Sequence, residues 1–346
     1  MDRRAFLRTA GLSALLAAGC ARRNSPSADT TAARAGTASA PAAGDGGAEA
    51  ADAASGRARV VLIKRQEWKS PPTADSLRSG LAKGIVALTG ASDAAAAWRS
   101  LFQPDENVAI KVNCLAGPSL SSSPALAAAL TAEMVAAGHD RARLWIYDRT
   151  SAELEQAGYT LQDSPRNTRC LGSDEVGYEP EVTLTGDVGT WFSLIVKEWA
   201  DALINLPVAK DHDLAGISGA LKNHFGSISN PNKLHMPDIS AAIADVAAAP
   251  PIADKQRLVV YDALRVCYDG GPGFKPATTV PYGAVLLSRD PVAADAVVIS
   301  ILDKLRQAHG LQPLASRDAA PTHVRLAADK HGLGEADLEA IEVVEV

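Results

Sequence analysis

Short apolar runs, rich in β-branched residues, alternate with amphipathic stretches along the chain after residue 58. Apolar runs of this length, bounded by polar or turn residues, predict buried strands. We expect strands at 60–63, 108–112, 144–147, 202–206, 258–261, 284–287 and 341–344. Between them, apolar residues recur at the spacing of one helix face. These helices are expected at 74–88, 124–137, 214–225, 239–248 and 291–307.

Helix starts carry their own signals. Thr73, Ser123 and Asp290 stand where N-cap residues belong, directly before three of the predicted helices. Pro124 and Pro291 then occupy the first helical position, where a proline is well tolerated because that amide has no intrahelical partner. The boundaries of these three helices are therefore predicted by two signals, periodicity and capping.

The alternation of strands and helices predicts an α/β fold over residues 59–346, with a mostly parallel sheet covered by helices on both faces. Residues 150–200 are less regular and are a possible insertion. In such sheets, ligands commonly bind beyond the carboxyl ends of the strands. This rule selects five places as candidates for a site, namely Asn113, Asp148, the segment 210–212, Asp262 and the segment 288–290.

The first 58 residues follow a different pattern. Residues 1–20 begin with the paired arginines Arg3 and Arg4 and continue into a small, apolar stretch that ends at Cys20. This order resembles a twin-arginine export signal with a lipoprotein-like processing site, so Cys20 is the expected lipidation site. Ordinary signal cleavage is the alternative. Residues 21–58 contain no Val, Ile, Leu or aromatic residue and are expected to form a disordered tether rich in Ala, Gly, Ser and Pro.

This signal implies a location and two partners. The twin-arginine export machinery would carry the folded protein across the cytoplasmic membrane, and a lipid on Cys20 would anchor it there. The expected location is the periplasm or the outer face of that membrane. No apolar run in the chain reaches the roughly 18 residues of a spanning helix.

Charge and cysteine content exclude several classes of protein. The chain has 34 Lys+Arg against 40 Asp+Glu, a net charge of −6, which argues against a nucleic-acid partner. Residues 1–58 hold seven Lys+Arg and five Asp+Glu, so residues 59–346 carry a net −8. Any anion site must therefore be a local cluster. The four cysteines form no C-x-x-C motif, and we expect no iron–sulfur cluster.

The densest polar cluster lies between residues 210 and 235. It contains three lysines and three histidines, namely Lys210, Lys222, Lys233, His212, His224 and His235. Lysines hold carboxylates and phosphates as point charges, and histidines move protons or ligate metals. The first amides of a helix at 214–225 would also favour an anion. The alternative is that Lys222 and His224 only cap that helix.

Four segments resemble the domain-of-unknown-function 362 (DUF362) family. They are Asn205-Leu206-Pro207 with its continuation through Lys210-Asp211-His212 to Gly226, then Val108–Asn113, Ile146–Arg149 and Asp290–Asp295. The similarity covers most of residues 59–346. Members of the family are often exported by the twin-arginine route or fused to iron–sulfur modules. The resemblance implies functional roles for Lys111, Asn113, Lys210, His212, Lys222 and Asn223.

We expect catalytic roles for His212, Lys210 and Lys222, and substrate-binding roles for Lys111, Asn113 and Asn223. A divalent metal is an option, with ligands drawn from His212, His224, His235 and Asp148. Asp148 could instead pair with Lys111 or Lys210. Asp295, on the last predicted long helix, could reach the site and would need a partner if it points inward.

Three further features bear on the site. Cys114 follows Asn113 directly and is expected to belong to the core, with a reactive thiolate as the alternative. Cys170 and Cys267 could form a disulfide after export. The glycine-rich segment 268–273 lacks the Lys-Ser/Thr ending of a P-loop and is expected to be a mobile loop beside the site.

These observations support two main hypotheses and do not decide whether the protein is an enzyme. The first is an exported enzyme that acts on a small anionic ligand, a carboxylate or a phosphate, through a Lys/His/Asn site, with or without a metal. The second is a membrane-tethered solute- or metal-binding protein. A structural or partner-docking role is the third.

Overall fold

The computed structural model describes residues 57–235 and 238–346. The expected signal at 1–20, Cys20, and all but the last two residues of the expected tether lie outside the described residues. Strand β1 begins at Ala58, the last position assigned to the tether. In the described part of the chain, no helix is both long enough and apolar enough to cross a membrane.

A ten-stranded sheet is the centre of the fold. Its main path follows the order β12-β1-β11-β10-β7-β2-β3-β4, with β8 and β9 attached beside β10. The strands are β1 (Ala58–Lys64), β2 (Val108–Val112), β3 (Leu144–Tyr147), β4 (Arg169–Cys170), β7 (Ala202–Leu206), β8 (Val208–His212), β9 (Gly216–Ile217), β10 (Gln256–Cys267), β11 (Thr279–Ser288) and β12 (Ile341–Glu345). All seven predicted strands are confirmed, and β10 and β11 are several residues longer than predicted.

Most neighbouring strands of this path are parallel. The pairs β12–β1, β10–β7, β7–β2, β2–β3 and β3–β4 run parallel. Strand β11 runs antiparallel to both of its neighbours, β1 and β10. Strands β2, β3 and β7 therefore end at the same edge of the sheet, and β8 continues from β7 along that edge after Pro207.

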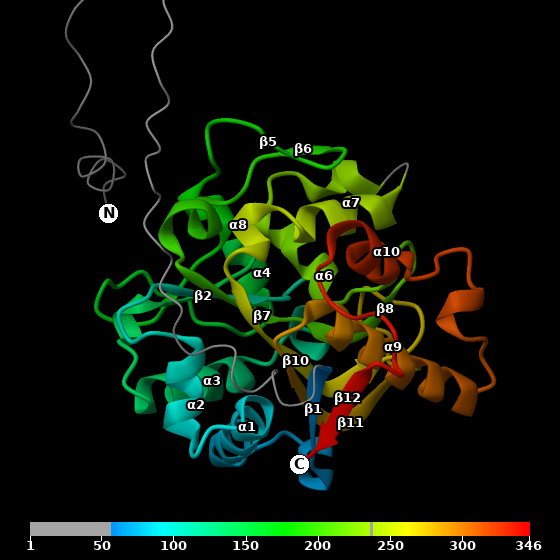
Figure 1. Ribbon diagram of the computed structural model, residues 1–346, viewed down its shortest axis with the longest axis horizontal. Helices are drawn as coiled ribbons and strands as arrows, with labels where there is room; N and C mark the ends of the chain where they lie inside the picture. Colours follow the sequence, from blue (N-terminus) through cyan, green and yellow to red (C-terminus); the bar gives the residue numbers. More distant parts are fainter. Residues whose placement is uncertain (1–56, 236–237) are drawn as a thin grey trace, which may run out of the picture. The chain divides into compact units, whose positions relative to one another are not determined.

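Helices cover both faces of the sheet, as predicted. They are α1 (Ala74–Thr89), α2 (Ala94–Leu101), α3 (Pro124–Ala136), α4 (Ser151–Gln156), α5 (Ser173–Val176), α6 (Ala220–Asn223), α7 (Ile239–Ala247), α8 (Pro250–Ala253), α9 (Pro291–Ala308) and α10 (Thr322–His331). Figure 1 shows α1, α2 and α3 grouped on one side of the sheet and α6, α7, α8 and α10 on the other.

Side chains alternate in direction along each strand, and the core is therefore divided into two layers, one on each face of the sheet. In β1, Val60 and Leu62 pack into the layer of α6, α7, α9 and α10, whereas Val61 and Ile63 pack into the layer of α1, α2 and α3. Successive side chains of a strand point to opposite faces, so an entirely apolar strand must be buried on both. This explains why the strands appear in the sequence as continuous apolar runs.

The predicted N-caps are confirmed. The side chains of Thr73, Ser123 and Asp290 accept hydrogen bonds from the amides of Ser76, Leu126 and Ala293, at 3.2, 3.4 and 2.8 Å. Each bond satisfies an amide that the first helical turn leaves without a partner. Asp290 thus caps α9.

The helix predicted at 214–225 is wrong. Gly216 lies in β9 with φ of +78°, and a Cβ there would come within 2.6 Å of the Pro321 nitrogen. Only the four residues of α6 are α-helical, and a 3-10 turn at His224–Ser227 follows. Glycine at 216 is therefore needed for a left-handed turn in close contact with another segment.

The segment 150–200 contributes to the sheet only at its edge. Its strand β4 pairs with β3, and a separate hairpin is formed by β5 (Thr183–Thr185) and β6 (Val188–Thr190). The irregular pattern of this segment thus corresponds to short elements. Cys170 in β4 and Cys267 in β10 are both buried with free thiols, so the possible disulfide between them is absent from the structure.

Candidate functional site

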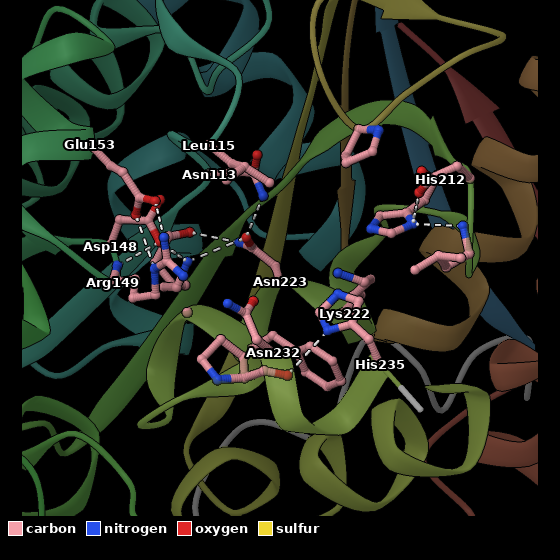
Figure 2. Close-up of a pocket in the computed structure, with 17 residues that line it drawn as sticks. Asn113, Leu115, Asp148, Arg149, Glu153, His212, Lys222, Asn223, Asn232 and His235 are labelled. Carbon is pink, nitrogen blue, oxygen red and sulfur yellow. Dashed lines mark hydrogen bonds and ion pairs between the residues drawn. The ribbon is translucent and has the colours of Figure 1, made fainter. Parts of the chain in front are cut away.

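A pocket of about 280 Å³ lies at the edge of the sheet where β2, β3 and β8 end. Its polar walls include Lys111, Asn113, Asp148, His212, Lys222 and Asn223. Figure 2 shows Asp148, Arg149 and Glu153 on one side, His212, Lys222 and His235 on the other, and Asn113 and Asn223 between them. The parallel strands and the loops after them bring these residues together.

Lys111 and Asp148 form a buried ion pair at the base of the pocket. The Lys111 Nζ lies 2.6 Å from Asp148 Oδ1 and donates a second bond of 2.6 Å to the Val112 carbonyl. The other carboxylate oxygen accepts the Cys114 amide at 2.6 Å. Both groups are thus largely satisfied within the protein, and their geometry fits a positioning role better than direct binding of a ligand.

Backbone packing supports this pair. A Cβ on Gly226 would lie 2.6 Å from both the Lys111 Nζ and the Asp148 Oδ1. The 3-10 turn that contains Gly226 therefore approaches the ion pair as closely as only a glycine allows.

A chain of amide side chains crosses the floor of the pocket. Lys210 Nζ donates to Asn113 Oδ1 at 2.8 Å, Asn113 Nδ2 donates to Asn223 Oδ1 at 3.1 Å, and Asn223 Nδ2 donates to Asn205 Oδ1 at 2.8 Å. Asn205 Nδ2 continues the chain to the Gln256 Oε1 at 2.9 Å. These bonds fix the orientation of Asn113 and Asn223, which line the pocket.

Lys210 lies behind this floor. It is 1% exposed, it is bonded to Asn113 and to the Leu120 carbonyl, and it does not line the pocket. Burial lowers the pKa of Lys210 to about 8. In this position Lys210 holds the Asn113 side chain, and its catalytic role stays a prediction.

Lys222 is the cation that the pocket leaves available. Its Nζ lies 5.0 Å from the centre of the Phe225 ring, and within residues 57–235 and 238–346 it forms no hydrogen bond or ion pair. Burial lowers the pKa of Lys222 to about 8, the neighbouring Lys111 lowers it further, and Asp213 acts in the opposite direction. An ammonium without a partner in a wall of the pocket can bind an anion or transfer a proton.

His212 is held in one tautomer. Its Nδ1 accepts the amides of Leu214 and Ala215 at 3.1 and 3.3 Å, so the hydrogen of the neutral ring is on Nε2, which Figure 2 shows turned toward the pocket. Burial, followed by the nearby Lys222, lowers the pKa of His212 to about 2. The Asp213 carboxylate lies 3.1 Å from Nδ1, but this contact is no ion pair because the ring is neutral. His212 is therefore a hydrogen-bond donor at neutral pH.

The four predicted metal ligands do not gather at one point. His235 packs against His212 with ring centres 6.1 Å apart, whereas His224 lies behind the pocket with its Nε2 2.6 Å from Gln256 Oε1. Asp148 is paired with Lys111. No group of three or more His, Cys, Asp or Glu side chains in the described residues is placed to hold a metal ion. This donor set does not fit a divalent cation.

The start of α6 is also unavailable to an anion. The amides of Ala220 and Leu221 donate to the two carboxylate oxygens of Asp295, at 2.6 and 3.1 Å. The hydroxyl of Tyr261 donates to the same carboxylate at 3.1 Å. Asp295 thus reaches the segment that carries Lys222 and closes its first turn, and burial raises the pKa of Asp295 to about 7.

The structure also places three further residues or segments that the sequence analysis singled out. Cys114 is buried, and burial raises the pKa of its thiol, so the expected core role is confirmed. The segment 268–273 lies beside the site, where Pro272 lines the pocket and the Gly271 amide donates to Asp211 at 2.6 Å. Lys233 is exposed and bonded to the Gly189 carbonyl, outside the pocket wall.

Sequence reasoning missed Glu153 and Asn232, and it quoted Arg149 and Asn205 in family-like segments without giving either a role at the site. Arg149 and Glu153 form an ion pair four residues apart across the first turn of α4, and Asn232 lines the pocket. Asn205 carried a usable signal, since it is a polar residue within the apolar run 202–206. A buried amide in a strand needs partners, and here these partners belong to the site.

One comparison with known proteins identifies a family. A family model described as "Domain of unknown function (DUF362)" matches residues 108–300, which is more than half of the chain. The match runs from β2 into α9 and includes all of the residues that line the pocket. A comparison with curated proteins finds no match. On the strength of the family match, the chain belongs to the DUF362 family.

Proposed function

We propose that the pocket binds a small anion, a carboxylate or a phosphate ester, and that Lys222 transfers a proton to or from it. The observation that carries this proposal is the Lys222 ammonium, which lines the pocket and has no polar partner within the described residues. By contrast, Lys111 forms an ion pair with Asp148, and Lys210 donates a hydrogen bond to Asn113.

The proposed reaction is general acid–base chemistry at a carbon next to a carboxylate. With a pKa near 8, Lys222 is mostly protonated at neutral pH but has a reactive neutral fraction, so it is suited to proton transfer. The His212 Nε2–H and the amide of Asn113 are donors that can stabilise negative charge developing on the ligand. Leu115, Leu214 and Phe225 form apolar walls for its carbon body.

The same proposal places the protein outside the cytoplasm. Residues 1–20 supply the twin-arginine-like signal and Cys20 the point of lipidation, so we propose export and anchoring at the outer face of the membrane or in the periplasm. Within the described residues no three of the candidate ligands are placed to hold one metal ion, so the proposed proton transfer is assigned to Lys222 and does not depend on a metal.

Hydrogen exchange tests the proposal directly. The protein is incubated in D2O with a panel of small carboxylates and phosphate esters, and the loss of each C–H signal is followed by proton NMR. We expect exchange next to the carboxylate of at least one ligand, and loss of that exchange in Lys222→Gln. Lys233→Gln is the matched control, since Lys233 belongs to the same sequence cluster but is exposed outside the pocket wall.

Binding measured on the same panel separates the two main hypotheses. A ligand that binds, depends on Lys222 and is recovered without exchange would favour a solute-binding protein. Binding and exchange that both persist in Lys222→Gln would contradict the assignment of the site.

A further inference from the structure

We propose a second binding site, on the face of the sheet that α1 and α3 cover, for a small aromatic carboxylate. The site is a hollow of about 270 Å³ between the 3-10 turn at Gln66–Lys69, the loop from β2 to α3 and the second half of β10. We call it the Arg265 hollow. No described residue lines both this hollow and the Lys222 pocket, so the proposal does not rest on the proposed function.

The two sites belong to different layers of the molecule. Trp68 and Leu264, which line the Arg265 hollow, pack into the core layer of α1, α2 and α3. Phe225, which lines the Lys222 pocket, packs into the layer on the other face of the sheet. A ligand in one site therefore leaves the other site open.

The walls of the Arg265 hollow are mainly apolar. They include four prolines, namely Pro71, Pro72, Pro118 and Pro124. A proline ring is rigid and its nitrogen carries no hydrogen, so it offers an apolar surface that needs no hydrogen-bond partner. Leu120, Leu264 and Trp68 complete the apolar part of the lining. Walls of this kind, with a few polar groups among them, are typical of sites for small organic ligands, and rigid rings suit a flat body.

Two cations line the same hollow and have no acidic partner. Lys69 and Arg265 are both exposed, and within residues 57–235 and 238–346 neither forms an ion pair. The Arg265 Nη1 donates to the Ser119 carbonyl at 3.1 Å, which holds the guanidinium at the hollow and leaves its charge available. Guanidinium groups bind carboxylates and also pack against aromatic rings.

Asp262 is the one acidic side chain among the described residues that line the hollow. It is 3% exposed, and its two oxygens accept the amides of Ser123 and Leu264 at 2.7 and 3.0 Å. These bonds join the loop before α3 to β10, so the shape of the hollow is set before a ligand binds. Two cations thus stand against one carboxylate that is already bonded, and the walls keep one positive charge in excess.

A hydroxyl group in the lining also lacks a partner. Ser121 lines the hollow, and its buried Oγ has no hydrogen-bond partner within the described part of the chain. Nearly all buried polar atoms in folded proteins are bonded. A bound carboxylate would give this hydroxyl an acceptor after rotation about one side-chain bond, and no hydrogen bond of the protein would be broken.

Isothermal titration of the full-length Lys222→Gln variant with 2-naphthoate tests the site, because this variant lacks the cation of the other pocket. We expect saturable binding of 2-naphthoate. Acetate, which lacks the body, and 2-naphthamide, which lacks the charge, should both bind much more weakly. Absence of saturable binding overturns the proposal, and so does equal affinity for 2-naphthamide. Binding that is seen in the wild type but lost in Lys222→Gln assigns the probe to the Lys222 pocket, which overturns this site and leaves the proposed function standing.

Removal of the two cations locates the carboxylate. In the Lys222→Gln background, the double variant Lys69→Gln, Arg265→Gln should weaken 2-naphthoate binding about tenfold, as expected for two partly exposed charge contacts. Binding of 2-naphthamide should stay the same. Lys83→Gln, at an exposed position of α1 outside the hollow, is the matched control. An affinity for 2-naphthoate that is unchanged in the double variant contradicts the site.

Filling the hollow locates the aromatic body. Ala125 is exposed at the start of α3 and lines the hollow, so Ala125→Trp should abolish binding of 2-naphthoate. Ala128→Trp is the matched control, since Ala128 is exposed on the same helix but does not line the hollow. Equal binding of 2-naphthoate by these two variants overturns the site.

Discussion

At the scale of single residues, burial and partners separate three lysines that look alike in the sequence. Lys111 is paired with Asp148, Lys210 is bonded to Asn113, and Lys222 has no polar partner within the described residues. The same low-dielectric surroundings lower the pKa of Lys210 and Lys222 to about 8. Only Lys222 combines this lowered pKa with a place in the pocket wall.

This combination predicts the pH dependence of anion binding. The Lys222 ammonium is present below its pKa of about 8 and is lost above it, so affinity should fall by up to about tenfold for each pH unit above that value. Titration calorimetry with the tightest ligand of the panel, from pH 6.5 to pH 9.5, measures this slope. Lys222→Gln should bind weakly at every pH, and a slope that survives in this variant would assign the titration to another group.

His212 should act through its donor and not through titration. Asparagine can keep an acceptor near the position of Nδ1 for the Leu214 and Ala215 amides, but it lacks the Nε2–H. His212→Asn should therefore lose ligand affinity and keep most of its stability, whereas His212→Phe should also lose about 1–3 kcal/mol of stability through the unpaired amides. Urea unfolding and calorimetry measure the two effects. Equal loss of stability in both variants would contradict this role of Nδ1.

At the scale of elements, contacts distant in sequence hold the short helix that carries Lys222. Asp295 of α9 closes the first turn of α6 and bonds Tyr261 of β10, while the 3-10 turn after α6 packs Gly226 onto the Lys111–Asp148 pair. A four-residue helix has little stability of its own. Its position therefore depends on α9, β10 and the ion pair.

Gly226→Ala tests this packing. The added Cβ would meet the Lys111 Nζ and the Asp148 carboxylate at 2.6 Å, so the pair must separate or the turn must move. Breaking a buried ion pair costs about 3 kcal/mol or more, and we expect a loss of that order in the free energy of unfolding. Gly273→Ala is the matched control, because a Cβ at 273 has no neighbour within 4 Å. Similar free energies of unfolding for the two variants would show that the turn can move to accept the Cβ without loss of stability.

At the scale of the whole molecule, buried histidines affect the stability of the fold at acid pH. Burial lowers the pKa of His212, His224 and His323 to about 2, 4 and 3. An unfolded histidine binds a proton below about pH 6.5 and these buried rings do not, so their contribution is lost as the pH falls below that value. Asp262 and Asp295, with pKa values raised by burial to about 6 and 7, act in the opposite direction and offset part of this loss.

His323 offers the cleanest test of this loss of stability at acid pH. It is fully buried, and neither ring nitrogen has a hydrogen-bond partner among residues 57–235 and 238–346. Because the wild type loses the His323 contribution below pH 6.5 and His323→Phe does not, the variant should gain about 2 kcal/mol relative to the wild type between pH 7.5 and pH 5. Urea unfolding at both pH values measures this difference. A difference independent of pH would contradict a neutral buried ring.

Much of the architecture was predictable because its causes are local. Strands buried on both faces need unbroken apolar runs, and the N-caps Thr73, Ser123 and Asp290 mark helix starts by a bond spanning three residues. Site residues such as Asn113 and His212 were found because they follow strands. The helix predicted at 214–225 was wrong because Gly216 has a conformation dictated by its contact with Pro321, which is distant in the sequence.

The sequence by itself determined the α/β class, the presence of seven strands, the starts of three capped helices, the family and the residues from which the site is drawn. The tertiary structure alone decided which of those residues are free to act. Whether a lysine is paired, whether a histidine is neutral and whether an amide already has an acceptor depend on groups that the sheet order brings together from 37 to 112 residues away. Desolvation and hydrogen bonding depend on groups that are close in space, so they cannot be predicted from periodicity along the chain.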